Sequence, residues 1–292
     1  MNITAMLPTL LLLALALVMF GLGLSLSVDD FKRLREHPRS VLLALVLQTV
    51  VLPGVAYLLI VVFGMEPVYA VGLMLLAASP GGVSANLFSH LFGGNVAMNI
   101  SLTAVNTVLS IATLPLIANW AIATFVQSGQ VVPLQYGKVL EVVGVILLPV
   151  IIGMAVRAKA PGFSERMGSP MKVFSALVLA GFALLAIVKE WSALTASFAS
   201  LGPLVLAFNL VSLLLGYYLS RWAGLKKSMA TAISFEIGIH NSTLAIYVAL
   251  SVLGNLQLAL PAALYSVSMY LTATLFGLLV LRHKAAPVGA PA

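Results

Sequence analysis

The sequence predicts an all-α polytopic membrane protein with about nine transmembrane helices. Of its 292 residues, 61% are hydrophobic and only 8% are charged, with a mean hydropathy of +1.12. A soluble domain has about 25% charged residues. Apolar runs of membrane-spanning length recur along the whole chain, and basic residues are concentrated in alternate connections between them. Composition, run length and charge placement thus agree on one fold class.

Each apolar run is long enough to cross a hydrocarbon core of about 30 Å as a helix. The predicted helices cover residues 4–27, 40–63, 68–92, 95–126, 137–157, 171–189, 201–221, 228–253 and 258–281. The first run has no Lys or Arg before Lys32 and no small-residue cleavage site after it. A secretory signal has a basic segment ahead of its apolar stretch, so we expect this run to be a retained first span.

The basic residues predict the orientation of the chain. Thirteen of the fifteen Lys and Arg residues fall in connections 28–39, 157–172, 221–227 and 282–284, and the alternate connections hold the other two. With nine spans, all four basic connections lie on one side of the membrane. The positive-inside rule makes that side cytoplasmic. We therefore expect a multi-pass protein of the cell (inner or plasma) membrane, with its N-terminus outside and its C-terminus cytoplasmic.

Composition also excludes several classes of function. The chain has no cysteine, which excludes disulfides, thiolate metal sites and a Cys nucleophile. Its net charge of +7 is explained by topology, so no nucleic-acid partner is expected. The expected partners are the lipid bilayer and a small solute, with no obligate protein partner. The final residues, 285–292, are expected to be a disordered tail.

Two predicted spans contain polar interruptions, one in each half of the chain. The stretch ASPGGVSANLFSH (78–90) includes Pro80, which lacks an amide hydrogen, and two glycines. The stretch FEIGIHNSTLA (235–245) places Glu236, His240 and Asn241 around Gly238. Such backbone breaks survive at bilayer depth only when buried in protein or lining a cavity. Paired breaks in the two halves indicate the midplane site of a secondary transporter.

The ends of broken helices suit two kinds of ligand. Unpaired carbonyls at the end of the first half-helix suit a small hard cation such as Na⁺. Free amide hydrogens at the start of the second half-helix suit a carboxylate. Ser84 and the sequence Asn241, Ser242 and Thr243 stand at such starts. The pattern therefore predicts that Na⁺ and an organic anion bind near each other.

The sequence resembles the bile acid:sodium symporter family, which includes animal bile-acid transporters and bacterial organic-anion relatives. The shared stretches are FGLGLSL (20–26), DFKRLREHP (30–38), SPGGVSANLFSHLFGGNVAMNISLTAVNTVLS (79–110) and FEIGIHNSTLA (235–245). The resemblance implies an inverted-repeat transporter with a panel domain, a core domain and two broken helices that cross in the core. Panel-type helices would lie in residues 1–39 and 137–200. Core helices would lie in 40–126 and 201–284.

The resemblance also implies two sodium positions that share Glu236. The first would be formed by Asn86, Asn99, Thr103 and Glu236. The second would be formed by Gln48, Glu236, the carbonyls of Ile237 and Ile239, and His240.

The chain departs from the family pattern at three of these places. Ala85 stands where Ser is frequent, Asn99 where Ser is usual, and His240 where Gln is typical. Imidazole offers nitrogen rather than oxygen and can be protonated near neutral pH. Three alternatives follow: two sodium ions bind, only the first sodium binds, or a proton at His240 replaces one sodium. We favour the second or the third.

Other polar residues have weaker signals. Asn99, Thr103 and Asn106 share one face of the fourth span, and we expect Thr103 to be a ligand and Asn106 to be structural. Glu141 is expected to be a solvated end residue. Tyr265 and Tyr270 either pack or line a substrate cavity, and Tyr270 is included with Ser84, Asn241 and Ser242 as a candidate substrate residue.

Two other classes of function compete with a carrier. Glu236 and His240 are four residues apart, as on a metal-binding helix face, but no HExxH-type cluster exists, which disfavours an intramembrane metalloenzyme. The polar groups are single and asymmetric rather than forming a ring, which disfavours a channel. We therefore predict a cation-coupled symporter that imports an organic anion, bile-acid-like or a small monocarboxylate such as pantoate, by alternating access. Neither enzymatic activity nor a transition metal is expected.

Overall fold

The computed structural model describes residues 3–126 and 136–281. The predicted tail at 285–292 and the basic residues of 282–284 lie outside these ranges. Within them the chain is helical, and the only β-type pairing is one isolated bridge. The predicted all-α class is therefore confirmed.

The elements follow the predicted apolar runs closely. In chain order they are α1 (Ile3–Ser25), α2 (Val28–Arg33), η1 (Leu34–Glu36), α3 (Pro38–Val46), η2 (Leu47–Val51), α4 (Leu52–Phe63), α5 (Pro67–Ala78), α6 (Val83–Leu91), α7 (Val96–Phe125), α8 (Tyr136–Lys159), α9 (Pro161–Lys189), α10 (Trp191–Trp222), α11 (Lys227–Gly238), α12 (Ser242–Tyr247), η3 (Val248–Val252), η4 (Gln257–Ala259), α13 (Leu260–Phe276) and η5 (Gly277–Leu281).

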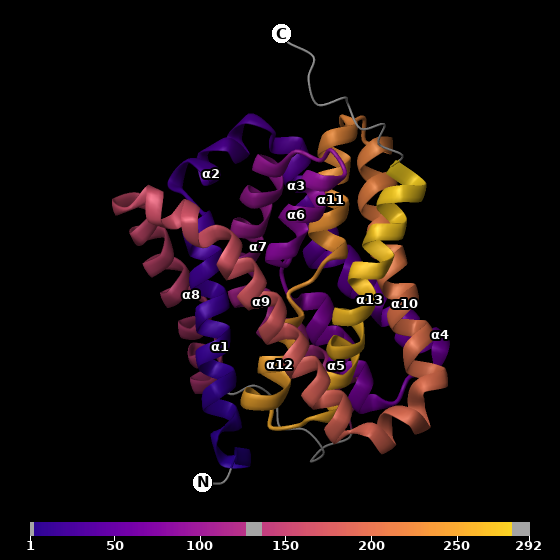
Figure 1. The fold of residues 1–292 in the computed structure, drawn as a ribbon. Coiled ribbons are helices and arrows are strands. Elements are labelled where there is room, and N and C mark those ends of the chain that lie inside the picture. The colour runs from indigo at the N-terminus through magenta and orange to yellow at the C-terminus, as the bar shows by residue number, and fades with distance from the viewer. Residues whose placement is uncertain (1–2, 127–135, 282–292) are drawn as a thin grey trace.

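With α3–η2–α4, α5–α6 and α11–α12 each taken as one segment, the long helical segments run in alternating directions between two ends of a bundle (Figure 1). We name these ends by the helices found there. The α2 end also contains the start of α11, and the α12 end contains the start of α1. The three basic connections between described helices, which follow α1, α8 and α10, all lie towards the α2 end. This is the arrangement that the charge pattern predicts.

Helices extend further than the apolar runs in several places. α9 begins at Pro161, ten residues before the predicted span, and the basic connection after α1 forms α2 and η1. Hydropathy detects the part of a helix that is apolar, whereas a helix continues wherever its backbone is bonded. Proline is also favoured at the first position of a helix. By length and apolarity, five described helices could cross a membrane, or six with the bent pair α1 and α2–η1. The count of nine spans remains a prediction.

Both predicted interruptions are present, and they contact each other. The first separates α5 from α6 and the second separates α11 from α12. The amide of Gly82 donates to the carbonyl of Ile239 at 2.7 Å, and the amide of Asn241 donates to the carbonyl of Pro80 at 2.8 Å. Each break thus satisfies polar backbone groups of the other, which is necessary where no water can do so.

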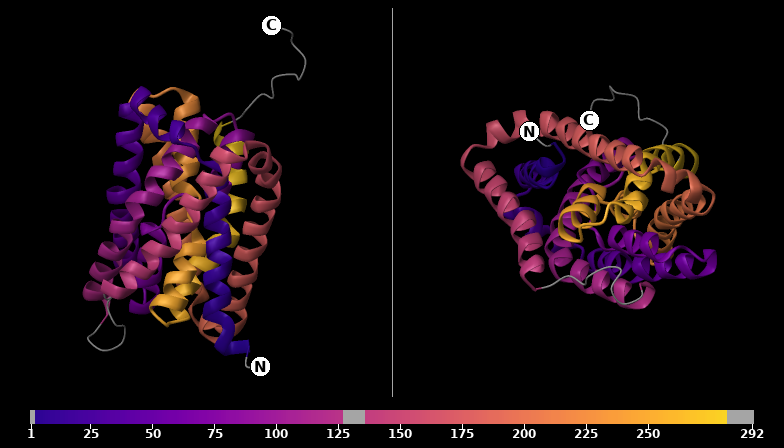
Figure 2. Two further views of the ribbon diagram at one scale, coloured as in Figure 1. Left: turned by 90° about the vertical axis from the view of Figure 1, so that its left-hand side faces the viewer. Right: turned by 90° about the horizontal axis from the view of Figure 1, so that it is seen from below.

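Two groups of helices surround this crossing. α1 packs mainly on α8 and α9, and a Cβ on Gly23 would collide with the carbonyl of Val150 in α8. The interrupted helices pack instead among α7, α10 and α13. Figure 2 shows α8 and α9 along the outer side of the bundle, next to α1. The division into a panel and a core at the predicted boundaries remains a prediction.

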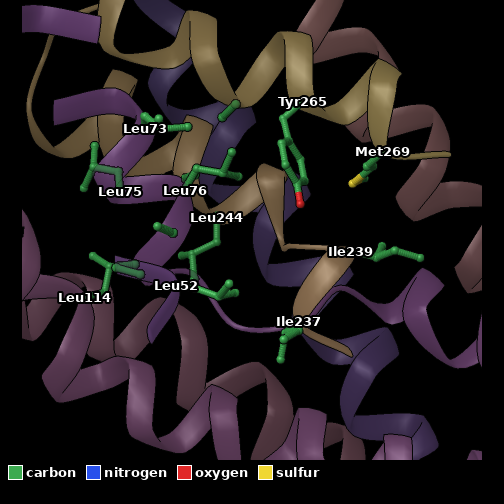
Figure 3. Close-up of a cluster of buried hydrophobic side chains, with 14 of the residues drawn as sticks. Leu52, Leu73, Leu75, Leu76, Leu114, Ile237, Ile239, Leu244, Tyr265 and Met269 are labelled. Atoms are coloured by element: carbon green, nitrogen blue, oxygen red, sulfur yellow. The ribbon is translucent and has the colours of Figure 1, made fainter. Parts of the chain in front are cut away.

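Apolar side chains close the interior around the crossing. Figure 3 shows Leu52, Leu76, Leu114 and Leu244, from four different helices, pointing into one cluster. Each of these leucines is fully buried. These apolar side chains pack beside the crossing, so its buried polar groups lie in a medium of low polarity.

Candidate cation and anion site

A fully buried carboxylate stands at the centre of the candidate site. Glu236 lies on α11, and two side chains of α7 contact it. The hydroxyl of Thr103 donates to Oε2 at 2.6 Å, and Nδ2 of Asn106 donates to Oε1 at 2.9 Å. Asn106, which we expect to be structural, joins α7 to α11 by bonding Glu236, itself a predicted sodium ligand.

The first interruption lies directly against this carboxylate. A Cβ added to Gly81 would collide with the carboxyl group of Glu236. Only glycine permits this approach of backbone to side chain. The two halves of the chain therefore meet at Glu236 as well as at the crossing.

Three predicted sodium ligands have amide oxygens that accept no hydrogen bond. Oε1 of Gln48, Oδ1 of Asn86 and Oδ1 of Asn99 are buried, and no donor within the described ranges reaches them. In Gln48 the nitrogen donates to the carbonyl of Ser79 at 2.9 Å, and in Asn99 it donates to that of Ala232 at 2.8 Å. Because a carbonyl can only accept, these contacts determine which amide atom is the oxygen. A buried acceptor without a partner costs about 1–3 kcal/mol, so a cation that binds these oxygens would relieve that cost.

Two residues of the predicted second sodium position, Gln48 and His240, contact the same carbonyl, that of Ser79. Nδ1 of His240 lies 3.2 Å from the carbonyl oxygen of Ser79, which also accepts from Gln48. A carbonyl cannot donate, so Nδ1 holds the hydrogen and Nε2 presents a lone pair. Nε2 is buried and has no partner among the described residues, and the ring stacks on Phe208 with centroids 5.6 Å apart. The carbonyl of Ile239, a predicted ligand, already accepts from Gly82.

The sequence did not predict the polar cap on the end of α11. The carbonyl of Gly238, which the break deprives of a helical partner, accepts from Nδ2 of Asn209 at 3.0 Å and from the hydroxyl of Tyr265 at 2.8 Å. Figure 3 shows the hydroxyl of Tyr265 pointing from α13 towards this segment. Asn209 also contacts Thr272. The available signal was a lone Asn within an apolar run, since such a residue must find a partner in a neighbouring helix.

All four candidate substrate residues line one small pocket. Its volume is about 30 Å³, close to that of a single small polar group, and Ser84, Asn241, Ser242 and Tyr270 form its wall together with His240. The hydroxyls of Ser84 and Tyr270 lie 3.1 Å apart. Asn241 caps α12, because its side-chain oxygen accepts from the amide of Leu244. The starts of α6 and α12 therefore meet at this pocket.

Larger cavities continue from this pocket towards the α2 end. A cavity of about 200 Å³ between α1, α8 and α9 shares Val83 with the small pocket. A third cavity, of about 460 Å³, shares Arg157 and Pro161 with the second. Arg157 thus borders both larger cavities, and its guanidinium donates to the carbonyl of Leu24 at 3.2 Å.

The α12 end has a polar link between the two groups of helices. Glu141 on α8 accepts from the hydroxyl of Tyr247 on α12 and pairs with Lys138 at 3.0 Å. The side chain of Glu141 is 39% exposed, in agreement with the expected solvation. Its contact with Tyr247 was not predicted from the sequence. Within the described ranges, no group of three or more His, Asp and Glu side chains is positioned to hold a metal ion.

The fold and the site together define a class: helical membrane proteins in which two interrupted helices cross beside a buried carboxylate and several unpaired oxygens. A family model described as "Sodium Bile acid symporter family" matches residues 12–198. The chain belongs to this family. The resemblance seen in the sequence is thereby confirmed, and the family's description agrees with the expectation of a transporter rather than an enzyme.

Named relatives come from animals, plants and bacteria. The "P3 protein" of Mus musculus is 32% identical over 221 residues, which cover 75% of this chain and 46% of the relative. The "Probable sodium/metabolite cotransporter BASS1, chloroplastic" of Arabidopsis thaliana is 28% identical over 245 residues, 83% of this chain and 59% of the relative. The "Uncharacterized sodium-dependent transporter YocS" of Bacillus subtilis is 25% identical over 243 residues, 83% and 74% of the two chains. The chain thus spans about half the length of the P3 protein.

Proposed function

We propose that the protein is a sodium-coupled symporter that imports an organic anion by alternating access. The supporting observation is the buried carboxylate of Glu236, placed at the crossing together with unpaired amide oxygens. These groups offer a hard monovalent cation one negative charge and several oxygen ligands in a dry interior. Two relatives have printed names that describe sodium-dependent transport, which agrees with this proposal.

The first sodium ion would bind between α6, α7 and α11. Its ligands would be the oxygens of Asn86, Asn99, Thr103 and Glu236. The hydroxyl of Thr103 can donate either to Glu236 or to the carbonyl of Asn99, 3.0 Å away, and donation to Asn99 would turn its lone pairs towards an ion at Glu236. Binding would neutralise the carboxylate, whose burial without a counter-charge is costly.

The anion would bind where the starts of α6 and α12 meet. Amide hydrogens and positive helix-dipole ends favour a carboxylate there, and the hydroxyls of Ser84, Ser242 and Tyr270 can donate to it. The pocket accommodates the carboxylate group, while the adjoining cavity of about 200 Å³ accommodates the apolar part of the anion. A bile-acid-like steroid and a short monocarboxylate such as pantoate both remain candidate substrates.

Transport would require the crossing to face the two sides of the membrane in turn. The cavities at the α2 end and the Glu141–Tyr247 contact at the α12 end describe a protein that faces the α2 side. We assign that side to the cytoplasm because the basic connections lie there. The N-terminus is then outside and the C-terminus inside, and an inward sodium gradient drives import.

A carrier of the same fold with one sodium ion, or with a proton, is the alternative. It is favoured by His240, whose Nε2 lone pair is buried and unpartnered within the described chain. Sodium prefers oxygen to nitrogen, whereas a proton binds imidazole readily. In that case Gln48 and His240 would hold either no second ion or a proton.

Sodium binding to the purified protein tests the proposal. We expect saturable thermal stabilisation by sodium chloride over choline chloride, and none in Glu236→Gln. Glu141→Gln, which alters a carboxylate at the α12 end, should keep the wild-type response. A wild-type protein that sodium does not stabilise, or a Glu236→Gln variant with the full sodium response, would contradict the proposed site.

A further inference from the structure

Several buried hydroxyls outside the proposed sodium positions also lack partners within the described ranges, and two of them lie next to the proposed first sodium site. Ser89 on α6 and Thr231 on α11 are both 0% exposed, and neither oxygen makes a hydrogen bond within the described ranges. Most Ser and Thr hydroxyls inside this bundle donate to a carbonyl of their own helix, as Ser110 does to the carbonyl of Thr107 at 2.7 Å. A buried polar atom without a partner calls for an explanation such as a bound ion or water.

The two residues lie against the same glycine. A Cβ on Gly94 would collide with the hydroxyl of Ser89 and would lie 3.1 Å from the methyl group of Thr231. The amide of Gly94 donates to the carbonyl of Ser89 at 2.7 Å, which holds the backbone in place. The backbone at position 94 therefore packs directly against both residues, and a side chain there would displace the Ser89 hydroxyl.

Both residues lie between the proposed sodium site and the α2 end. On α6, Ser89 is three residues nearer that end than Asn86, and on α11, Thr231 is five residues nearer than Glu236. At 1.5 Å per residue these steps are about 5 Å and 7 Å. Asn99 lies at the same level, because its nitrogen bonds the carbonyl of Ala232, the residue after Thr231. Unpaired oxygens thus continue from Glu236 towards the α2 end on three adjacent helices.

We propose that Ser89 and Thr231 form a relay site for the alkali cation as it leaves Glu236 towards the cytoplasm. A small dehydrated cation cannot cross an apolar layer, so each step needs oxygens within reach of the last. The unpartnered Oδ1 of Asn99, which lies at the same level, would pass the ion from Glu236 to these hydroxyls. The inference rests on the proposed sodium coupling, and it adds an exit path that the two predicted sodium positions do not include.

A relay changes the rate of ion release without changing the affinity of the main site. Because the chain has no cysteine, Leu91→Cys at the exposed end of α6 can carry an environment-sensitive dye. Titration with sodium gives the binding midpoint, and rapid dilution into choline chloride gives the release rate. We expect Ser89→Ala and Thr231→Val to slow release about tenfold, equivalent to about 1.4 kcal/mol in the barrier, while the midpoint stays within about twofold.

Two matched variants separate the hydroxyl from packing. Thr231→Ser keeps the oxygen and loses the methyl group, so it should release sodium at the wild-type rate, whereas isosteric Thr231→Val should not. Ser110→Ala removes a buried hydroxyl that bonds its own helix and should also leave the rate unchanged. Gly94→Ala would push the Ser89 hydroxyl out of its position, because the new methyl group collides with that oxygen, and should slow release as Ser89→Ala does.

The outcomes distinguish this inference from the proposed function. Wild-type release rates in Ser89→Ala and Thr231→Val, or equal slowing in Thr231→Ser and Thr231→Val, would overturn the relay. A wild-type protein with no sodium-dependent signal would instead refute the sodium coupling on which the relay depends.

Discussion

The hydroxyl of Tyr247 donates to Oε1 of Glu141 at 3.2 Å and so joins α12, a half-helix of the crossing, to α8. Tyr247 is 1% exposed, whereas Glu141 lies at the surface. Within the described chain, this hydrogen bond links the two helix groups at the α12 end. It should therefore stabilise the closed arrangement of that end by an amount that can be measured.

Tyr247→Phe should lower the stability of the purified protein by about 1 kcal/mol, because a buried donor and its contact are lost. Lys138→Gln removes only the exposed ion pair of Glu141, and such pairs contribute at most about 1 kcal/mol and often nothing. Thermal unfolding in detergent measures both. The interpretation is wrong if Lys138→Gln lowers the melting temperature as much as Tyr247→Phe does.

Gly81→Ala should destabilise the protein by about 1–3 kcal/mol and weaken sodium-dependent stabilisation, because the new methyl group overlaps the carboxylate of Glu236. Gly144→Ala is the matched control. A Cβ at that position of α8 meets no atom within 4 Å, and alanine favours the helix. Sodium titrations monitored by thermal shift compare the two variants, and equal sodium responses would show that the close approach at Gly81 is not needed.

Asn209→Leu and Tyr265→Phe should each cost about 1 kcal/mol, since the carbonyl of Gly238 retains one donor in either variant. The double variant leaves this carbonyl without a donor and should cost more than the sum. A double-mutant cycle on unfolding free energies measures the excess. Strict additivity would mean that the two side chains do not share this carbonyl as a partner.

Ser84→Ala and Tyr270→Phe should each raise the KM for the transported anion by about fivefold, as expected for the loss of one hydrogen bond of about 1 kcal/mol. The sodium midpoint should stay unchanged, because these residues line the small pocket and not the cation position. Uptake into proteoliposomes with pantoate or taurocholate as probe gives the KM. Ser268→Ala is the control. The hydroxyl of Ser268 bonds the carbonyl of Tyr265 within α13, so its loss should leave the KM at the wild-type value.

If a proton at His240 replaces one sodium ion, uptake should rise as the outside pH falls, because more of the imidazole is then protonated. His240→Gln should then abolish the pH dependence and raise the number of sodium ions moved per anion from one to two, because an amide supplies oxygen. Flux ratios measured at imposed sodium and pH gradients give both quantities. A pH profile that His240→Gln leaves unchanged would exclude the proton.

The sequence was sufficient to predict the two interruptions, and the family resemblance implied that Thr103 lies near Glu236. The contacts of Asn106 and Gly81 with this carboxylate were not predicted. Proline, paired glycines and polar residues within apolar runs have few structural explanations in a membrane, so their positions were informative. The pairing of the two breaks through Gly82 and Asn241 could be expected only from the family resemblance, since no local pattern shows which segments cross.

Other parts of the site could not be predicted because they depend on distant contacts. Asn209 has an apolar sequence neighbourhood, and its role arises from a carbonyl 29 residues away. Ser89 and Thr231 look like ordinary small helix residues. Only the structure shows that their oxygens, unlike that of Ser110, bond no carbonyl of their own helix.

The crossing also restricts the order in which the chain can be assembled. His240 contacts the carbonyl of Ser79, 161 residues earlier, and the second break supplies the partners of the Gly82 amide and the Pro80 carbonyl at the first. During synthesis, the segment that contains Pro80 and Gly81 enters the bilayer long before its partner exists. The nascent chain must therefore keep this segment in contact with water, the insertion machinery or a temporary protein partner until most of the polypeptide has been made. Fragments that end before α11 should for this reason be recognised by membrane quality control as unfinished.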